Sequence, residues 1–327
     1  MNTQDLHLEN FNRLEYFPAS IFGMVMGMAG LVISFFVASH FFKPILTLAQ
    51  GGLIFVTALF AFLFAVYVCK TLRFRAAFLS EMQHPIKMNF GPTISIGLLL
   101  LSIAYLQFGY KEVSFYLWAI GSILQLLLTL WVLNHWFFHN HFEIHHSNPA
   151  WFIPIVGNII VPIAGVEHAN PLISWFFFSI GIVFWPVLKS ILVYRIIFHP
   201  PIMDRLIPTL FIFIAPPAVG FISYVKLSGS IDGFAYVLYF FALFFTLFLA
   251  STLKHFKKLD FAISWWAYTF PLAAISIASF TMAKHANEIF FANIGFAIQA
   301  VLFVLVLIFA YRTLKAALNK KICDPSH

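Results

Sequence analysis

A histidine-rich segment, NHWFFHNHFEIHHS, contains the residue types in this chain that come nearest to a metal site. Its candidate ligands are His135, His139, His141, Glu143, His145 and His146. Imidazole and carboxylate groups bind iron and other transition metals. His135 and His139 are four residues apart, so they share one face if the segment is helical. The chemistry to be considered first is therefore metal-dependent oxidation.

The stretch from His141 to His146 resembles a histidine box of membrane di-iron desaturases, but those enzymes need further histidine clusters to fill two metal sites. The remaining histidines are isolated along the chain: they include His40, His84, His168, His199, His255 and His285. We therefore expect a solvated loop whose charge varies with pH, and neither metal nor cofactor. The chain also lacks a GxxxxGK[ST] loop and a Rossmann fingerprint, and we predict that it is not an enzyme.

A second pattern is the pair Phe270 and Pro271 inside the apolar run WAYTFPLAAIS. Proline removes a helical hydrogen bond, and a membrane helix keeps it only where neighbours or a cavity satisfy the freed backbone. Phe270 is nine residues past Phe261, which places it roughly 14 Å into an apolar layer about 30 Å thick. A bulky ring beside a kink at this depth predicts a constriction.

The composition identifies the elements that must position these residues. The 327 residues are 61% hydrophobic and 9% charged, and the mean hydropathy is +0.91, which is typical of a polytopic membrane protein. Ten apolar spans are predicted, at 18–39, 45–69, 88–108, 113–136, 150–165, 172–194, 206–225, 233–253, 261–283 and 289–311. The fifth is the shortest. We predict an all-α integral membrane protein with a single transmembrane domain, 17–313, between tails 1–16 and 314–327.

The distribution of Lys and Arg predicts the orientation. One side of the predicted membrane domain has only Lys43, Lys111, Lys226 and Lys284, and the other bases flank the even-numbered connections and the tails. Since basic residues are retained on the cytoplasmic side, both termini are expected there, in the cell inner (plasma) membrane. The net charge of +7 is spread over short loops and contains no basic run, so a nucleic-acid partner is not expected.

Cleavage and cross-linking are not expected either. The N-terminal segment lacks a basic n-region and a small-residue cleavage site, so we do not expect a removable signal peptide. Cys69 and Cys323 both fall on the predicted inner side, and no disulfide is expected.

Paired in order, the spans form five helical hairpins, and prolines concentrate in the odd-numbered members. These are Pro18, Pro92, Pro154, Pro162, Pro208, Pro216, Pro217 and Pro271, while Pro186 is the internal proline of an even span. Prolines near a span start can simply begin a helix, because the first position needs no amide hydrogen. Pro216, Pro217 and Pro271 lie deeper and indicate kinks. The alternation predicts two helix populations, of which the odd one lines a path.

Small and uncharged polar residues occur on the same odd spans, as expected either for close helix packing and backbone-bonded hydroxyls or for an open lumen. The candidates for lining a pore or kinking its helices are Pro18, Ser20, Phe22, Gly23, Pro92, Thr93, Pro154, Gly157, Asn158, Pro216, Pro217, Thr269 and Pro271, with Phe270 as the gate.

No Asp, Glu, Lys or Arg falls near the midplane of an odd span, and such residues are the usual mark of proton relays and coupled transport. Their absence favours passive permeation. A lumen without carboxylates offers a cation no partner, and bases at the inner mouth concentrate anions, so the expected ligands are small inorganic anions. The alternative is a proton-coupled secondary transporter or exporter of dicarboxylate or tellurite oxyanions.

Five segments resemble the tellurite-resistance and dicarboxylate transporter (TehA-like) family, which includes plant guard-cell slow anion channels. They are FPASIFGMVMGMAGL from Phe17, NPAWFIPIVGNIIVPIAG from Asn148, WPVLKSILVYR from Trp185, IPTLFIFIAPPAVG from Ile207 and SWWAYTFPLAAISIAS from Ser264. Together they extend across most of the chain.

The resemblance implies a homotrimer in membrane lipid, with one pore per subunit. It implies five hairpins in quasi-fivefold arrangement around that pore, odd helices inside and even helices outside. The match at YTFPLA implies that Phe270 is the gating phenylalanine. Chloride, nitrate, tellurite and malate are the anions associated with the family. The short tails depart from the plant branch, so regulation through long phosphorylated extensions is not expected.

Overall fold

The computed structural model describes residues 12–139, 142–255, 259–319 and 321–323. Over these residues the chain is helical, without β-strands, and ten helical spans are long and apolar enough to cross a membrane. The spans are Ala19–Ala38, Lys43–Arg73, Lys87–Gln107, Lys111–Phe138, Pro149–His168, Pro171–Phe198, Asp204–Ser228, Gly233–Ser251, Ile263–Ala286 and Ile289–Leu318. The ten predicted spans are confirmed, although the shortest is the eighth, with 19 residues, and not the fifth.

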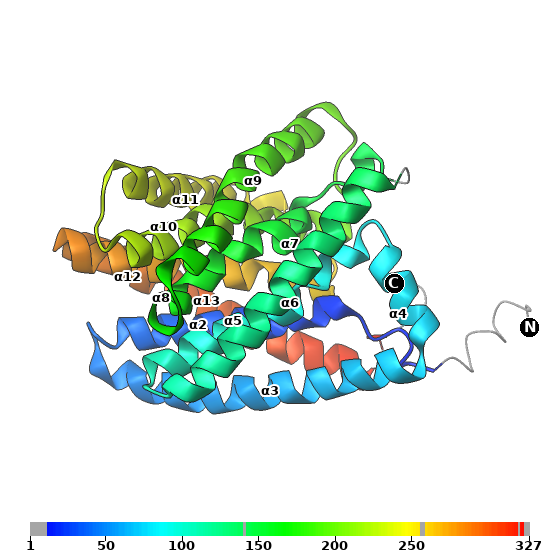
Figure 1. The fold of residues 1–327 in the computed structure, drawn as a ribbon, viewed down its shortest axis with the longest axis horizontal. Coiled ribbons are helices and arrows are strands. Elements are labelled where there is room, and N and C mark those ends of the chain that lie inside the picture. Colours follow the sequence, from blue (N-terminus) through cyan, green and yellow to red (C-terminus); the bar gives the residue numbers. More distant parts are fainter. Residues whose placement is uncertain (1–11, 140–141, 256–258, 320, 324–327) are drawn as a thin grey trace, which may run out of the picture.

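The even-numbered spans each contain one long α-helix. These helices are α3 (Leu46–Arg73), α6 (Lys111–Phe138), α9 (Pro171–Phe198), α11 (Gly233–Ser251) and α13 (Ile289–Leu318). Only 28 to 33% of each even span is buried within the protein. Figure 1 shows α3, α6 and α9 running across the face of the bundle. Their exposed apolar side chains can contact lipid tails, because lipid tails are as apolar as the side chains themselves.

The odd-numbered spans are broken helices that are mostly buried. Each begins with 3₁₀ segments and continues as α-helix, a change of helix type that often marks strain or function. The first span is η1 (Ala19–Phe22) and α2 (Gly23–Ala38), and the third is η3 (Lys87–Phe90) and α5 (Thr93–Gln107). The fifth alternates through η5 (Pro149–Trp151), α7 (Phe152–Val156), η6 (Gly157–Ile160) and α8 (Val161–His168). The seventh is η7 (Asp204–Phe213) and α10 (Ala215–Ser228), and the ninth η9 (Ile263–Tyr268) and α12 (Thr269–Ala286).

Burial separates the two populations sharply. Within an 18-residue apolar window of each span, the first, third, fifth and seventh spans are 83% buried and the ninth is 78% buried, against at most 33% for any even span. The alternation of two helix populations that the prolines predicted is therefore present in the fold.

The deep prolines lie in the first turn of an α-helix, directly after the change of helix type, and not in the interior of the helix. Pro216 and Pro217 are in the first turn of α10, and Pro271 is the third residue of α12. The expected kink inside each α-helix is therefore a junction between a 3₁₀ segment and a new α-helix. Proline is tolerated there because first-turn amides have no acceptor within the α-helix.

Polar side chains from neighbouring spans donate hydrogen bonds to backbone carbonyls of the irregular fifth span. The Pro154 carbonyl accepts hydrogen bonds from Gln125 Nε2 at 2.9 Å and Thr129 Oγ1 at 2.6 Å. Trp118 Nε1 donates to the Val161 carbonyl at 3.0 Å, and the Ser223 hydroxyl donates to that of Ile159. These bonds offset the cost of burying unpaired carbonyls in an apolar layer.

The first and ninth spans pack closely enough to fix their register. A Cβ atom on Gly27 would lie 1.9 Å from Thr269 Oγ1, so only glycine allows this approach. Two turns further on, Ser34 Oγ lies 3.0 Å from Ser276 Oγ, and Gln299 Nε2 of α13 donates to Ser34 Oγ at 2.8 Å. This packing holds the residue after Thr269, Phe270, against the first span.

A buried ion pair anchors the start of the first span. Lys70 Nζ of α3 lies 2.5 Å from Glu81 Oε2 of α4 (Arg75–Gln83), and both side chains are buried. Glu81 Oε1 also accepts the Ala19 amide at 2.7 Å, and Lys70 Nζ donates to the Phe17 carbonyl at 2.8 Å. Because both charges are paired and hydrogen-bonded, their burial is tolerated.

Breaking this pair is expected to destabilise the protein. Glu81→Gln and Lys70→Met each leave a buried charge without its partner, which costs about 3 to 5 kcal/mol. The melting temperature of the purified protein in detergent should fall for both variants. The double variant should melt above either single one because it buries no lone charge. Single variants that melt like the wild type would contradict the assigned role.

Gly27→Ala is expected to force the first and ninth spans apart, since the added methyl group would overlap Thr269. The matched control is Gly51→Ala, where a Cβ meets no atom within 4 Å. Thermal unfolding should show a lower melting temperature for Gly27→Ala alone. Adding Thr269→Ala removes the nearest overlapping atom, Oγ1, but keeps Cβ at 2.6 Å, so it should recover part of the loss. Equal losses with and without it would refute the overlap.

Candidate functional site

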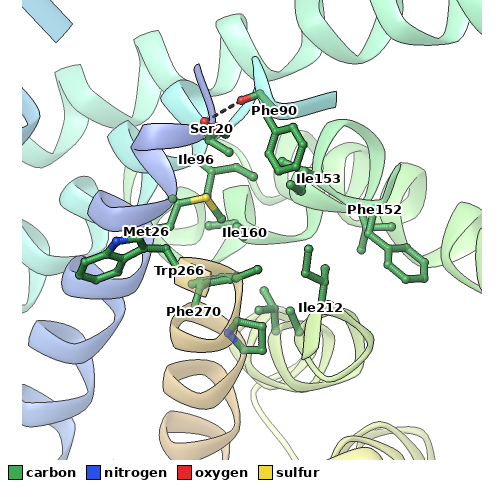
Figure 2. Close-up of a pocket in the computed structure, with 18 of the residues that line it drawn as sticks. Ser20, Met26, Phe90, Ile96, Phe152, Ile153, Ile160, Ile212, Trp266 and Phe270 are labelled. Atoms are coloured by element: carbon green, nitrogen blue, oxygen red, sulfur yellow. Dashed lines mark hydrogen bonds between the residues drawn. The ribbon is translucent and has the colours of Figure 1, made fainter. Parts of the chain in front are cut away.

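A cavity of about 80 Å³ lies between the odd-numbered spans, and all five of them contribute to its wall. Figure 2 shows Met26, Ile96, Ile160, Ile212 and Phe270 converging on it, one from each odd span. The rest of the wall consists of Ser20, Gly23, Phe90, Thr93, Phe152, Ile153, Val156, Gly157, Ala215, Pro216, Val219, Ile263, Ser264, Trp266, Ala267 and Pro271. No lining residue is charged, so the cavity offers an ion apolar walls and a few hydroxyl and backbone groups.

Phe270 is the last partly exposed residue of the ninth span before a fully buried stretch. Its side chain is partly exposed, whereas the residues from Pro271 to Phe280 are all buried. The ring lies against the first span, since a Cβ on Gly30 would be 3.6 Å from Phe270 Cδ2. The closer neighbour is Ala273, whose Cβ would lie 2.7 Å from a Cβ on Gly30, so glycine here permits the approach of α12 to the first span.

A wider vestibule of about 1480 Å³ adjoins the cavity at the end where the odd spans begin. The two share Ser20, Phe90, Ile263 and Ser264 in their walls, so one continues into the other. The vestibule is also lined by the end of α13 and the residues after it. Its position makes it the entrance to the cavity.

The vestibule, unlike the cavity, is charged. Its described bases are Lys70, Lys87, Arg205, Arg312, Lys315 and Lys321, and its described acids are Glu15, Glu81, Asp204 and Asp260. Lys70 and Glu81 neutralise each other, which leaves an excess of bases. Partial desolvation and the neighbouring Lys87 and His146 lower the pKa of His84, which also lines the vestibule.

The structure places the residues predicted from the sequence in three groups. The cavity is lined by Ser20, Gly23, Thr93, Gly157, Pro216, Phe270 and Pro271, and Pro18 lines the vestibule. The others lie off the cavity wall and are buried: Phe22, Pro92, Pro154, Asn158, Pro217 and Thr269.

Two of the buried residues that do not line the cavity contact even-numbered spans. The Phe22 ring packs edge-on against the Phe60 and Tyr67 rings of α3, and Asn158 Nδ2 donates to Thr129 Oγ1 at 2.9 Å. Both therefore connect odd spans to even ones.

Several lining residues were not predicted, chiefly the large apolar ones. Met26 follows Ser20 and Gly23 at intervals of three, and Ile96 follows Phe90 and Thr93 in the same way. This spacing places each set on one helix face and could have extended the prediction. Nothing in the sequence distinguishes these apolar side chains from the many that pack against neighbouring helices.

The histidine segment does not assemble a metal site among the described residues, where no three potential ligands gather. The His135 ring stacks on that of His139 with centroids 4.4 Å apart, and His135 Nδ1 lies 2.9 Å from the Trp131 carbonyl. His145 Nδ1 lies 3.1 Å from the exposed Glu143 carboxylate. His141 lies outside the described residues.

Comparison with known proteins gives relatives along nearly the whole chain. An uncharacterized transporter of Methanocaldococcus jannaschii is 29% identical over 89% of this chain and 90% of its own length. The S-type anion channel SLAH3 of Arabidopsis thaliana is 28% identical over 82% of this chain, but only 43% of that longer protein is covered. The tellurite resistance protein TehA homolog of Haemophilus influenzae is 22% identical over 93% of this chain and 91% of its own length.

These relatives are membrane transporters and channels, in agreement with the ten spans and the uncharged internal cavity. The family model for voltage-dependent anion channels matches residues 16–314, which includes all five odd spans that surround the cavity. The resemblance predicted from the sequence is confirmed, and the chain belongs to the voltage-dependent anion channel (SLAC1) family.

Proposed function

We propose that this protein conducts small monovalent anions, such as chloride and nitrate, passively along a path from the vestibule through the cavity. Phe270 closes that path. The observation that carries the proposal is an uncharged cavity walled by all five odd spans, with the partly exposed Phe270 at the end away from the vestibule. A bulky apolar ring in a narrow apolar passage stops flow by occlusion and by excluding water.

The pore is formed by a quasi-fivefold ring of five hairpins, with the odd helices inside and the even helices outside. The support is the burial of 78% or more in every odd span against 33% or less in every even one. Ten spans return both termini to the same side, which the basic excess identifies as the cytoplasm of the cell membrane. The chain forms a homotrimer with one such pore per subunit, as its family resemblance implies.

Charge at the entrance gives the path its selectivity for anions. The excess of bases in the vestibule raises the local anion concentration, and no carboxylate in the cavity is available to hold a cation. The first, third, seventh and ninth spans begin at the vestibule, so the positive dipole ends of their helices point toward it. The names of the S-type anion channel relatives agree with this direction of selectivity.

Proton-coupled export of dicarboxylate or tellurite oxyanions receives less support from the same cavity. A coupled transporter usually carries an ionisable group inside the membrane, and no cavity residue is ionisable. The two functions differ in proteoliposomes. A channel lets anions flow only down their electrochemical gradient, whereas uptake against that gradient when a pH difference is imposed would favour the transporter.

Phe270→Ala is expected to increase anion current by at least about tenfold, because the side chain that closes the passage is removed. The measurement is whole-cell current in oocytes, or current in planar bilayers, normalised to surface expression. The matched control is Phe244→Ala on α11, whose ring is 59% exposed on the outer surface, and its current should match the wild type. Equal currents from Phe270→Ala and the wild type at equal expression would refute the gate.

Removing vestibule bases is expected to reduce current in a salt-dependent way. Arg205→Gln combined with Lys315→Gln should lower the chloride current about two- to threefold at 10 mM salt, and by little at 1 M, because the Debye length falls from about 30 Å to 3 Å. Lys226→Gln, at the opposite end of the seventh span, is the control. A reduction that is the same at both salt concentrations would count against electrostatic concentration of anions.

A further inference from the structure

In three of the odd spans, an isoleucine follows a cavity-lining residue by seven positions. Met26, Ile96 and Phe270 line the cavity, and the residues seven positions further along α2, α5 and α12 are Ile33, Ile103 and Ile277. Seven residues make two turns, so each isoleucine lies on the same helix face as its partner, about 10 Å further along. The faces of α2, α5 and α12 that line the cavity therefore each carry an isoleucine two turns further along.

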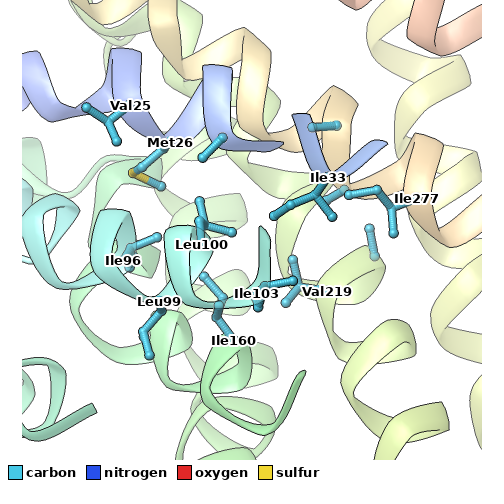
Figure 3. Packing of buried hydrophobic residues seen from close by; sticks show 14 of the residues in the cluster. Val25, Met26, Ile33, Ile96, Leu99, Leu100, Ile103, Ile160, Val219 and Ile277 are labelled. Atoms are coloured by element: carbon cyan, nitrogen blue, oxygen red, sulfur yellow. The ribbon is translucent and has the colours of Figure 1, made fainter. Parts of the chain in front are cut away.

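These outer isoleucines, Ile33, Ile103 and Ile277, are buried, with exposed fractions of 3%, 4% and 9%. They belong to one hydrophobic cluster with Val219 of the seventh span, which is 5% exposed and also lines the cavity. Figure 3 shows Ile33, Ile103, Ile277 and Val219 grouped beyond Met26 and Ile96. Beyond the cavity wall, four of the five odd spans thus contribute branched aliphatic side chains to one buried cluster.

Contacts between the helices place the outer isoleucines at a common depth. The 3.0 Å contact of Ser34 Oγ with Ser276 Oγ sets Ile33 level with Ile277, since each is the neighbour of one of the serines. A Cβ on Gly97 would lie 3.5 Å from Val25 Cγ1, which sets the register of α5 against α2. Counted from that contact, Ile103 and Ile33 differ in depth by less than one turn.

Isoleucine and phenylalanine obstruct a path in different ways. A β-branched side chain in a helix keeps essentially one χ1 rotamer, so these isoleucines cannot swing aside without movement of their helices. Phe270 adjoins open cavity and Gly30, where its ring has room to change position. An anion among aliphatic groups also has no donor to replace its water, so the site resists both water and ions.

We propose that Ile33, Ile103 and Ile277, with Val219 at their inner edge, form a second, outer hydrophobic barrier that still restricts the path, without sealing it, when Phe270 moves. This inference rests on the proposed anion path and adds to it a second constriction in series with Phe270. Full opening requires the odd helices to separate at this level, in addition to displacement of the phenylalanine ring. The current through Phe270→Ala is then limited by the outer barrier.

The first experiment measures single-channel current in planar bilayers with symmetrical chloride. Adding Ile277→Ala to Phe270→Ala should raise unitary current at least about threefold, and Ile277→Ser should raise it further because a hydroxyl hydrates the constriction. The nitrate to chloride permeability ratio should fall with Ile277→Ser, which a purely structural loss would not produce. The control is Ile275→Ala in the Phe270→Ala background, because Ile275 is fully buried on the same helix two residues away, on another face.

The second experiment tests the barrier without relying on conduction. In a Cys69→Ser, Cys323→Ser background that contains Phe270→Ala, Ala267→Cys and Ile277→Cys are exposed to a membrane-impermeant anionic thiol reagent from the vestibule side. Ala267 lines the cavity and is partly exposed, so Ala267→Cys should react readily. Ile277→Cys should react at least about tenfold more slowly if the outer barrier restricts the path.

The outcomes separate this inference from the proposed function. Equal labelling of Ile277→Cys and Ala267→Cys, or unitary currents of Phe270→Ala that Ile277→Ala and Ile277→Ser leave unchanged, would overturn the outer barrier while the channel stands. If no variant carries current but Ile277→Cys still reacts slowly, the channel function fails. The slow reaction then still shows that the reagent does not pass the level of the outer isoleucines. Protection together with increased current supports both.

Discussion

The structure depends on the rule that backbone polar groups in an apolar layer must be hydrogen-bonded within the protein. The odd spans carry prolines and 3₁₀ segments that leave carbonyls without helical partners, so they are stable only where other protein groups reach them. Gln125, Thr129 and Trp118 of the fourth span, and Ser223 of the seventh, donate hydrogen bonds to carbonyls of the irregular fifth. The unbroken even helices need no such help and can face lipid.

The same rule explains why the cavity lies where the helix type changes. Close approach of the first and ninth spans at Gly27 and Thr269 fixes the junction at which α12 begins, and Phe270 follows directly. The buried pair Lys70 and Glu81 holds the other end of the first span beside the vestibule. Phe270 therefore projects from a firmly positioned backbone onto the wall of the cavity.

Charge and apolarity are divided along the proposed path. The vestibule carries the bases that attract anions, the cavity has no charge, and the level beyond it is filled with aliphatic side chains. An anion would meet attraction where water is plentiful and a dehydration cost where the walls are apolar. Flow is then set by the opening of apolar constrictions and not by a binding site that holds the ion.

The sequence by itself determined the ten spans, because the length and hydropathy of a segment decide whether it can cross a membrane. It singled out Phe270 through its place beside a deep proline. It also predicted the buried odd population, since proline demands protein neighbours. Only the tertiary structure decided that Pro216, Pro217 and Pro271 begin α-helices at 3₁₀ junctions, and that Ser20 faces a cavity while Phe22 packs on α3. Met26 and Ile96 were likewise indistinguishable from packing residues, because the direction of an apolar side chain in an all-apolar span depends on contacts between helices.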